Sequence, residues 1–310
     1  MASTKAIKQR IRSVRNTAQI TKAMEVVSAT KMRRSQEFAL KARPYAAASL
    51  ALMQNLLRRI PEGIQSALLM KRDVKRSLLL VVTSDKGLAG AFNANIAKKA
   101  AQWIAEKRAN RKPYALITVG KKSKDYFERR EETPVKSFGG YGDYTTPAQT
   151  LGVTDAVVSG FLDGSWDEVE AVYTNFRTTL VQEAVMKKIL PATPEGLEDA
   201  IRGILPESGK FSAQLLAAAD TRYNYEYKFE PSPAQILDAL VPQLIRIHIH
   251  HVILESNASE HSARMVAMKS ASDNATELIS GLSLAYNKAR QAGITRELIE
   301  VTAGKEALEI

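Results

Sequence analysis

A long hydrophobic repeat in the carboxy-terminal part of the chain restricts the fold most strongly. Steps of three and four residues alternate from Leu237 to Ala289, and thirteen of the sixteen positions reached are apolar. The positions are Leu237, Leu240, Leu244, Ile247, His251, Leu254, Ala258, His261, Met265, Met268, Ser272, Ala275, Ile279, Leu282, Tyr286 and Ala289. A repeat sustained over so many heptads predicts a coiled coil. No Pro follows Pro242, so a helix over residues 243–292 would be about 75 Å long at 1.5 Å per residue.

The amino-terminal part of the chain predicts a second long helix. Residues 3–57 contain no Gly and one Pro, Pro44. A narrow stripe with coiled-coil spacing comprises Ile7, Ile11, Val14, Ala18 and Thr21, and Ile20, Met24 and Val27 continue it one residue out of phase. Because Pro44 lacks an amide hydrogen and crowds the preceding turn, we expect the helix to end or kink near Arg43.

Between these helices the sequence has the pattern of an α/β domain. Runs rich in β-branched residues predict strands at residues 77–83, 114–119, 135–138 and 168–176. Helical stretches fall between them at 91–109 and 148–161, with an irregular one at 121–130. Strands and helices that alternate imply crossover connections and a mostly parallel sheet.

The segment before the last helix predicts a loop followed by a strand. Residues 191–222 are rich in Pro, Gly and polar residues, with at most a short helix near 197–204. Residues 223–229 predict a returning strand, and Pro231 and Pro233 mark the exit into the last helix.

The predicted fold class is therefore α/β plus a long antiparallel coiled coil. The expected domains are an amino-terminal coiled-coil helix at 1–60, a central Rossmann-like, mostly parallel α/β domain at 75–230, and a carboxy-terminal coiled-coil helix at 232–310. The two helices can pair only if they run antiparallel, because the domain between them holds their inner ends together.

Most of the positive charge belongs to the first helix. Residues 1–43 contain eleven Lys and Arg against Glu25 and Glu37, a net charge of +9 out of +11 for the whole chain. Such a segment attracts nucleic acid, anionic lipid or an acidic protein surface, unless it is simply a solvated helix face. Residues 1–37 contain no aromatic side chain, which makes the nucleic-acid signal weak.

The turn at residues 84–93 is where a Rossmann-like fold would bind a nucleotide. Its sequence, SDKGLAGAFN, has neither the G-x-G-x-x-G nor the G-x-x-x-x-G-K-[ST] spacing that cradles phosphate. A tight strand-to-helix turn is the stronger interpretation, and we expect no cofactor.

The sequence shows no candidate metal or catalytic residues. His248 and His251 share a helix face at i, i+3, but a structural role in the helix seam is favoured over zinc. The acidic pairs are adjacent in sequence, and nothing in the sequence indicates that two carboxyl groups converge on one cleft, as general acid and base catalysis requires. The chain contains no Cys, which excludes disulfides and thiolate chemistry. No apolar run reaches the roughly 18 residues of a membrane span.

Several blocks of sequence closely resemble the gamma subunit of rotary ATP synthases. The first is KAIKQRIRSVRNT at residues 5–17, followed by ITKAM at 20–24 and RPYA at 43–46. The others are SEHSARMVAMK at 259–269, DNA at 273–275, YNKARQA at 286–292, IT at 294–295, and the turn at 84–93. These blocks span nearly the whole chain in the family's order. The match begins at Lys5, which implies a bacterial-type subunit without a removable presequence.

The resemblance implies a non-catalytic central stalk subunit of a proton-translocating ATP synthase. The paired helices would rotate inside a ring of three alpha and three beta subunits and couple proton flow to ATP synthesis or hydrolysis. The α/β domain would bind the epsilon subunit and sit on the membrane c-type ring. The expected location is the cytoplasmic face of the bacterial cell membrane, as a peripheral protein that touches the membrane only indirectly and binds no nucleic acid.

The resemblance also implies which residues contact the ring. Met24 matches the position that meets the acidic lever of the beta subunit. Arg264, Gln291 and Thr295 match positions that meet the catch loops, and Arg290 and Glu297 lie beside them.

Three positions depart from the usual pattern. Ala89 stands where the family often has Cys, and Ala91 replaces a usual Gly. Gly293 alone would predict the end of a helix, whereas the family implies that the helix continues towards Leu308. Two alternatives remain: a coiled coil that binds nucleic acid, and a nucleotide-dependent enzyme that uses the central domain.

Overall fold

The computed structural model describes residues 4–59, 66–142, 145–176, 178–179, 181–193, 230 and 232–308. The chain divides into two compact units. The central unit is Thr30–Ala263, and the coiled-coil unit combines Met1–Ala29 with Arg264–Ile310. The strand predicted at 223–229 and the short helix predicted at 197–204 lie outside the described residues.

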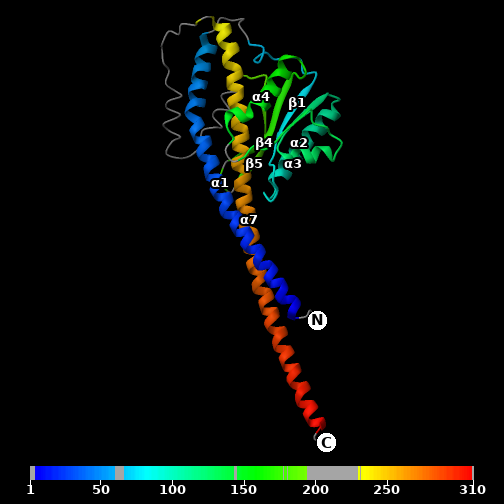
Figure 1. Ribbon diagram of the computed structural model, residues 1–310. Helices are drawn as coiled ribbons and strands as arrows, with labels where there is room; N and C mark the ends of the chain where they lie inside the picture. Colours follow the sequence, from blue (N-terminus) through cyan, green and yellow to red (C-terminus); the bar gives the residue numbers. More distant parts are fainter. Residues whose placement is uncertain are drawn as a thin grey trace. The chain divides into compact units, whose positions relative to one another are not determined.

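A five-stranded sheet with the order β3-β2-β1-β4-β5 runs through the central unit (Figure 1). Its strands are β1 (Ser77–Val82), β2 (Tyr114–Val119), β3 (Lys136–Phe138), β4 (Glu168–Phe176) and β5 (Gln182–Leu190). The first four are parallel, and β5 pairs with β4 in the antiparallel direction. The prediction of a mostly parallel sheet is confirmed. All six residues of β1 are buried, because a central parallel strand is covered on both faces.

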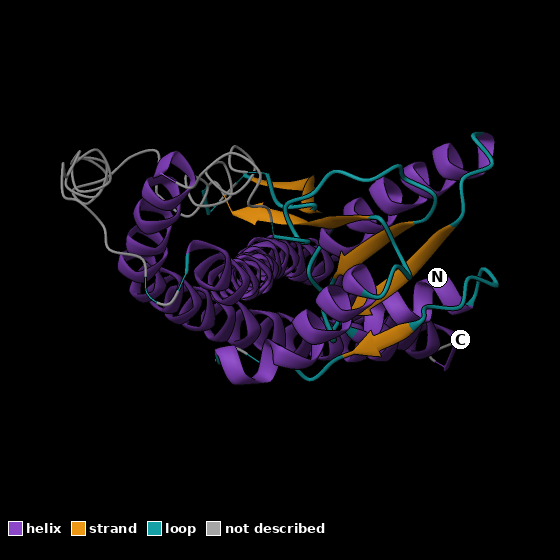
Figure 2. Cartoon of the chain, turned by 90° about the horizontal axis from the view of Figure 1, so that it is seen from above, coloured by secondary structure: helices purple, strands orange, loops and turns teal. Residues whose placement is uncertain are grey.

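Helices cover both faces of this sheet (Figure 2). The crossovers are α2 (Phe92–Ala109), α3 (Lys121–Glu128) and α4 (Pro147–Leu162), close to the predicted ranges. On one face Ile96 and Trp103 of α2 pack with Phe127 of α3. On the other face Val153 and Val157 of α4 pack with the first part of α7. Two hydrophobic layers therefore enclose the sheet.

The last helix, α7, runs from Pro233 to Leu308. Its first part belongs to the core of the central unit, with Leu244, Ile245 and Ile249 buried there. Every residue from His248 to Ser259 is buried. Burial therefore extends beyond the repeat positions, which a two-helix seam alone would not produce. Several residues between the repeat positions, among them Ile245, Ile249 and Ile253, are also apolar and belong to the core of the central unit, so this part of the helix is buried on more than one face.

The predicted seam is present in the coiled-coil unit. There α1 (Thr4–Arg59) and α7 lie side by side and run in opposite directions (Figure 1). The inward residues of α7 are Met265, Met268, Ser272, Ala275, Ile279, Leu282, Tyr286 and Ala289, all buried or half-buried as predicted. On α1 they are Ile7, Ile11, Val14, Ala18, Thr21 and Ser28. The spans from Ile7 to Ser28 and from Met268 to Ala289 are equal in length, as an antiparallel pair requires.

The predicted shift of phase in the first helix is wrong. Ile20 and Val27 are 61% and 52% exposed, whereas Ser28 is 2% exposed. The inward stripe keeps its original phase because a seven-residue repeat has to keep facing its partner helix. The place of a residue in the repeat decides its burial more than its polarity does. Ser28 therefore lies in the seam, whereas Ile20 and Val27 lie outside it.

Two predictions about helix ends have different outcomes. The helix was expected to end or kink near Arg43, but α1 continues through Pro44 to Arg59. A Pro inside a helix costs roughly 3 kcal/mol, and residues 45–59 on its far side are rich in Ala and Leu, which favour helix strongly. At the other end α7 continues through Gly293 to Leu308, as the family resemblance implied.

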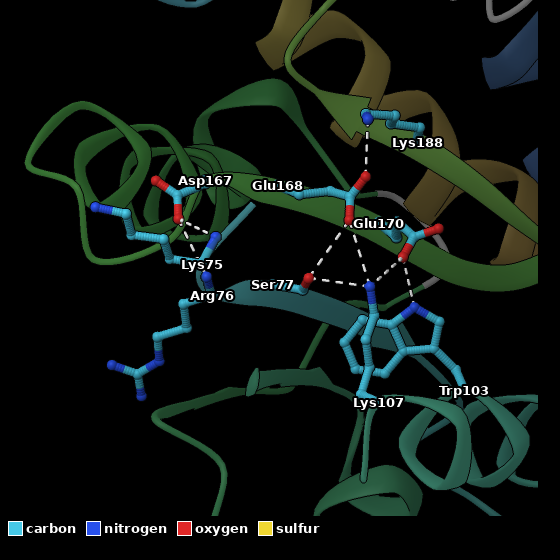
Figure 3. A network of polar contacts seen from close by, with 9 residues as sticks. All are labelled: Lys75, Arg76, Ser77, Trp103, Lys107, Asp167, Glu168, Glu170 and Lys188. Atoms are coloured by element: carbon cyan, nitrogen blue, oxygen red, sulfur yellow. Dashed lines mark hydrogen bonds and ion pairs between the residues drawn. The ribbon is translucent and has the colours of Figure 1, made fainter. Parts of the chain in front are cut away.

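A polar network joins α2 to β1, β4 and β5 (Figure 3). Lys107 Nζ lies 3.0 Å from Ser77 Oγ and 3.4 Å from Glu168 Oε2. Lys188 Nζ lies 2.7 Å from Glu168 Oε1. Although burial acts to raise the pKa of Glu168, the two lysines lower it overall. The network therefore ties the edge strand β5 to the middle of the sheet.

Candidate partner-binding surface

Met24 lies on an apolar stripe at the outside of α1. Met24 itself is half-buried, and its neighbours Ile20 and Val27 are largely exposed. The spacing of four and then three residues places these three side chains on one face of the helix. We call Ile20, Met24 and Val27 the outer stripe. A row of exposed apolar side chains is typical of a surface that contacts a partner.

Four of the other predicted contact residues lie together on the last turns of α7. Arg290, Gln291, Thr295 and Glu297 are exposed, as is every side chain from residue 290 to residue 304. We call residues 290–304 the tip. The inward seam residues stop at Ala289, and Figure 1 shows α7 continuing past the amino-terminal end of α1.

An apolar strip runs between the predicted contact residues of the tip. Ile294, Leu298 and Val301 are 49%, 61% and 70% exposed. With 3.6 residues per turn, Arg290 and Glu297 flank this strip on one side. Gln291 and Thr295 flank it on the other side. The arrangement of an apolar centre with polar flanks matches the anatomy of protein interfaces.

Leu298 and Val301 were missed by the sequence reasoning. The available signal was their spacing of four and seven residues from Ile294, in a segment that no inward stripe of α1 reaches. Helical spacing of apolar residues without a facing partner predicts a binding surface as well as a core.

Arg264 differs from the other predicted contact residues because it is only 8% exposed. It stands at the start of the α7 segment in the coiled-coil unit. Arg290 lies 26 residues further on, which is about 39 Å along the helix. The structure therefore groups the four tip residues, and it places Arg264 and Met24 elsewhere.

The beginning of α1 gives the coiled-coil unit a positive surface. Arg10, Arg12 and Arg15 are exposed. The first turn of α1 carries no acidic residue, so the positive end of the helix dipole adds to these charges. This surface attracts acidic groups.

The turn between β1 and α2 is occupied by its own polar side chains. Asn93 Oδ1 accepts the N–H of Ser84 at 3.1 Å, and Asp85 Oδ1 accepts the N–H of Lys121 at 2.9 Å. Asp85 Oδ2 accepts the N–H of Gly140 at 2.9 Å. The carboxylate of Asp85 thus lies at the start of α3, the kind of position at which nucleotide-binding folds hold a phosphate. Its negative charge makes a tight structural turn the better interpretation.

The four histidines are all buried on α7. His250 Nδ1 lies 3.2 Å from Thr150 Oγ1 of α4, and His251 Nδ1 lies 3.8 Å from Glu255 Oε2 of its own helix. Burial, together with the charge of Lys187, lowers the pKa of His248 to about 4. Across the described ranges no group of three metal-binding side chains comes together. The contacts of His250 and His251 agree with a structural role for these two side chains in packing.

None of the described helices is both long enough and apolar enough to cross a bilayer.

A coiled coil built from both chain ends, with an α/β domain inserted between them, places the chain in the class of coiled-coil proteins with an inserted α/β domain. The family model described as ATP synthase matches residues 3–308. The chain is 42% identical to the ATP synthase gamma chain of Cyanothece sp. over 315 aligned residues, and 42% identical to that of Geobacter sp. over 310, with 100% of each chain covered in both cases. The chain therefore belongs to the family of ATP synthase gamma chains, which are the rotor subunits of the central stalk.

Solved structures share the fold at lower sequence identity. One is the central stalk and c-ring of the Tetrahymena thermophila mitochondrial ATP synthase, with a TM-score of 0.59, 22% identity, and coverage of 82% of this chain and 99% of that chain. Another is the rotor of the Euglena gracilis mitochondrial ATP synthase, with a TM-score of 0.60, 16% identity, and coverage of 94% and 98%.

Proposed function

We propose that this chain is the non-catalytic rotor of a proton-translocating ATP synthase. Its coiled coil turns inside a ring of alpha and beta subunits and couples proton flow to ATP synthesis or hydrolysis. The observation that carries this proposal is the tip of α7, where Ile294, Leu298 and Val301 are exposed beside the family's contact positions. Exposing such an apolar strip to water is unfavourable in free energy, and contact with a surrounding ring of subunits would bury the strip.

The ring contacts form two sets. Met24, within the outer stripe, meets the acidic lever of the beta subunit, and the basic start of α1 guides that contact. Arg290, Gln291, Thr295 and Glu297 of the tip meet the catch loops of the ring. Arg264 completes the second set, and its burial in the chain suggests that it acts by holding α7 in position as well.

The functional regions follow the division into residues 1–60, 75–230 and 232–310. The central α/β domain binds the epsilon subunit and rests on the membrane c-type ring. The assembled complex lies at the cytoplasmic face of a bacterial cell membrane, where this chain is peripheral. Purification of the natural complex is expected to yield alpha and beta subunits at three copies each, together with epsilon.

Replacing Met24 with Lys tests the contact with the beta subunit. An ammonium group added to an apolar contact would pair with the acidic lever, so attraction would hold the rotor instead of guiding it. We expect Met24→Lys to fold, assemble and hydrolyse ATP, but to pump several-fold fewer protons per ATP. The measurement is ATP-driven acidification of inverted membrane vesicles, normalised to the rate of hydrolysis.

Gln19→Lys is the matched control, because Gln19 is exposed on another face of α1 and the substitution adds the same charge. Its coupling is expected to equal that of the unchanged chain. Normal coupling in Met24→Lys would argue against this contact.

A further inference from the structure

A groove of about 720 Å³ lies between α2 and α3 on the central unit. We call it the α2–α3 groove. Its apolar lining comprises Val81, Ala94, Ala97, Ala101, Ala105 and Phe127. All of these residues belong to the central unit, so the groove is separate from the coiled-coil surfaces described above.

The shape of the groove suits a helix. Ala94, Ala97, Ala101 and Ala105 follow steps of three and four residues, so they share one face of α2 over about three turns, or roughly 16 Å. Small side chains let a neighbouring helix approach closely, because the distance between packed helices depends on the side chains at the contact. A helix laid along α2 would therefore find a long apolar floor.

The rim of the groove is positively charged. It includes Lys98, Lys122, Arg129 and Arg130, whereas Asp125 is the only carboxylate in the lining. Within the part of the chain that the structure describes, Lys98, Lys122 and Arg129 form no ion pair. The guanidinium of Arg130 stacks on the ring of Tyr126, 3.8 Å from its centre, which fixes one of these charges at the edge of the groove.

We propose that the α2–α3 groove binds an acidic, amphipathic helix of a partner protein. Apolar side chains spaced like the alanines of α2 would enter the floor, and carboxylates on either side would meet the basic rim. This is the helix-in-groove mode of recognition. An elongated floor three turns long fits a peptide better than a compact lipid headgroup. The groove uses no residue of the coiled coil, so a failure of this inference would leave the proposed contacts with the alpha and beta ring untouched.

The probe is a fluorescent synthetic peptide about four turns long, with Leu on one helical face and Glu on the other. Its binding to the full chain is measured by fluorescence anisotropy at low and high salt. We expect saturable binding that weakens at least tenfold as salt is raised. A second peptide in which every Glu is replaced by Lys is expected to bind at least tenfold more weakly.

Two pairs of variants locate the binding. Ala101→Trp fills the floor, and Ala109→Trp adds the same side chain at an exposed position of α2 outside the groove. Lys122→Glu with Arg129→Glu reverses the rim, and Lys71→Glu with Lys75→Glu makes the same change of charge elsewhere. The groove variants are expected to weaken binding at least tenfold, and the controls less than twofold. Thermal melting by circular dichroism establishes that each variant folds.

Three results would overturn the proposal. The first is that the acidic peptide fails to bind the folded chain. The second is that this peptide binds Ala101→Trp as well as it binds Ala109→Trp. The third is that the basic peptide binds the chain as well as the acidic peptide does. Anionic vesicles give a fourth test: if they compete for the groove while the peptide does not, the groove recognises lipid and the proposal fails.

Discussion

A Cβ added at Gly160 of α4 would lie 2.1 Å from Cζ2 of Trp166. The indole is held in place by its own hydrogen bond, because Trp166 Nε1 donates to the carbonyl oxygen of Val157 at 3.0 Å. Trp166 and Val157 are both buried in the layer that joins α4 to the sheet. Because Gly160 has no side chain, the ring of Trp166 can pack directly against α4 in the core.

Gly160→Ala is therefore expected to destabilise the chain by about 1–3 kcal/mol. The ring has to move, and the move stretches its hydrogen bond and opens the packing behind it. The measurement is the free energy of unfolding in urea. Gly152→Ala on the same helix is the control, since its Cβ would lie 3.4 Å from Phe138 Cε1. The control is expected to be neutral or to stabilise by up to about 1 kcal/mol, and equal effects of the two variants would contradict the explanation.

His248 makes the stability of the chain depend on pH. Its pKa is about 4 in the folded chain, because it is buried and faces the charge of Lys187, and about 6.5 in an unfolded chain. The unfolded state therefore binds the proton first as the pH falls. The stability from neutral His248 is fully present above about pH 6.5 and is lost as the pH falls towards 4.

We expect this residue alone to remove about 2 kcal/mol of stability between pH 7 and pH 5. His248→Gln keeps a polar side chain of similar size that does not titrate in this range. The urea midpoint of the unchanged chain should fall between these pH values by more than that of His248→Gln. Parallel pH dependences of the two chains would show that His248 is not responsible.

At the scale of helices and strands, most elements were predictable because their side chains follow one period clearly. β2 and β4 fell on the predicted residues, and the inward positions of α7 followed the heptad repeat from Met265 to Ala289. β5 was missed because its charged residues, Glu183, Lys187 and Lys188, hide the pattern of a strand that is only partly covered. The contact residues could be proposed only from the family blocks, since spacing alone does not tell a seam from an exposed stripe, as Ile20 and Val27 show.

The continuity of α7 through Gly293 can be tested by substitution. A Cβ at Gly293 would meet nothing within 4 Å, so Gly293→Ala should stabilise the tip by about 1 kcal/mol through helix propensity. Hydrogen exchange is expected to slow at residues 290–304. Gly164→Ala is the contrast, because Gly164 has a φ of +78°, where Ala is strained. Faster exchange at the tip in Gly293→Ala would mean that Gly293 ends the helix.

At the scale of the whole molecule, both ends of the chain form one unit and the middle forms another. α7 takes part in both, because one continuous helix supplies the core of the central unit and then the seam with α1. The family membership of the full chain agrees with a role as the rotor subunit of the central stalk.

The most direct test of this role is rotation of the central unit in the assembled complex. The chain contains no Cys, so Lys112→Cys, at an exposed site beside β2, gives a single point for attaching a visible bead. With the alpha and beta ring fixed to a surface, addition of ATP is predicted to turn the bead continuously in one direction. A bead that stays still while the same complexes hydrolyse ATP would contradict the account.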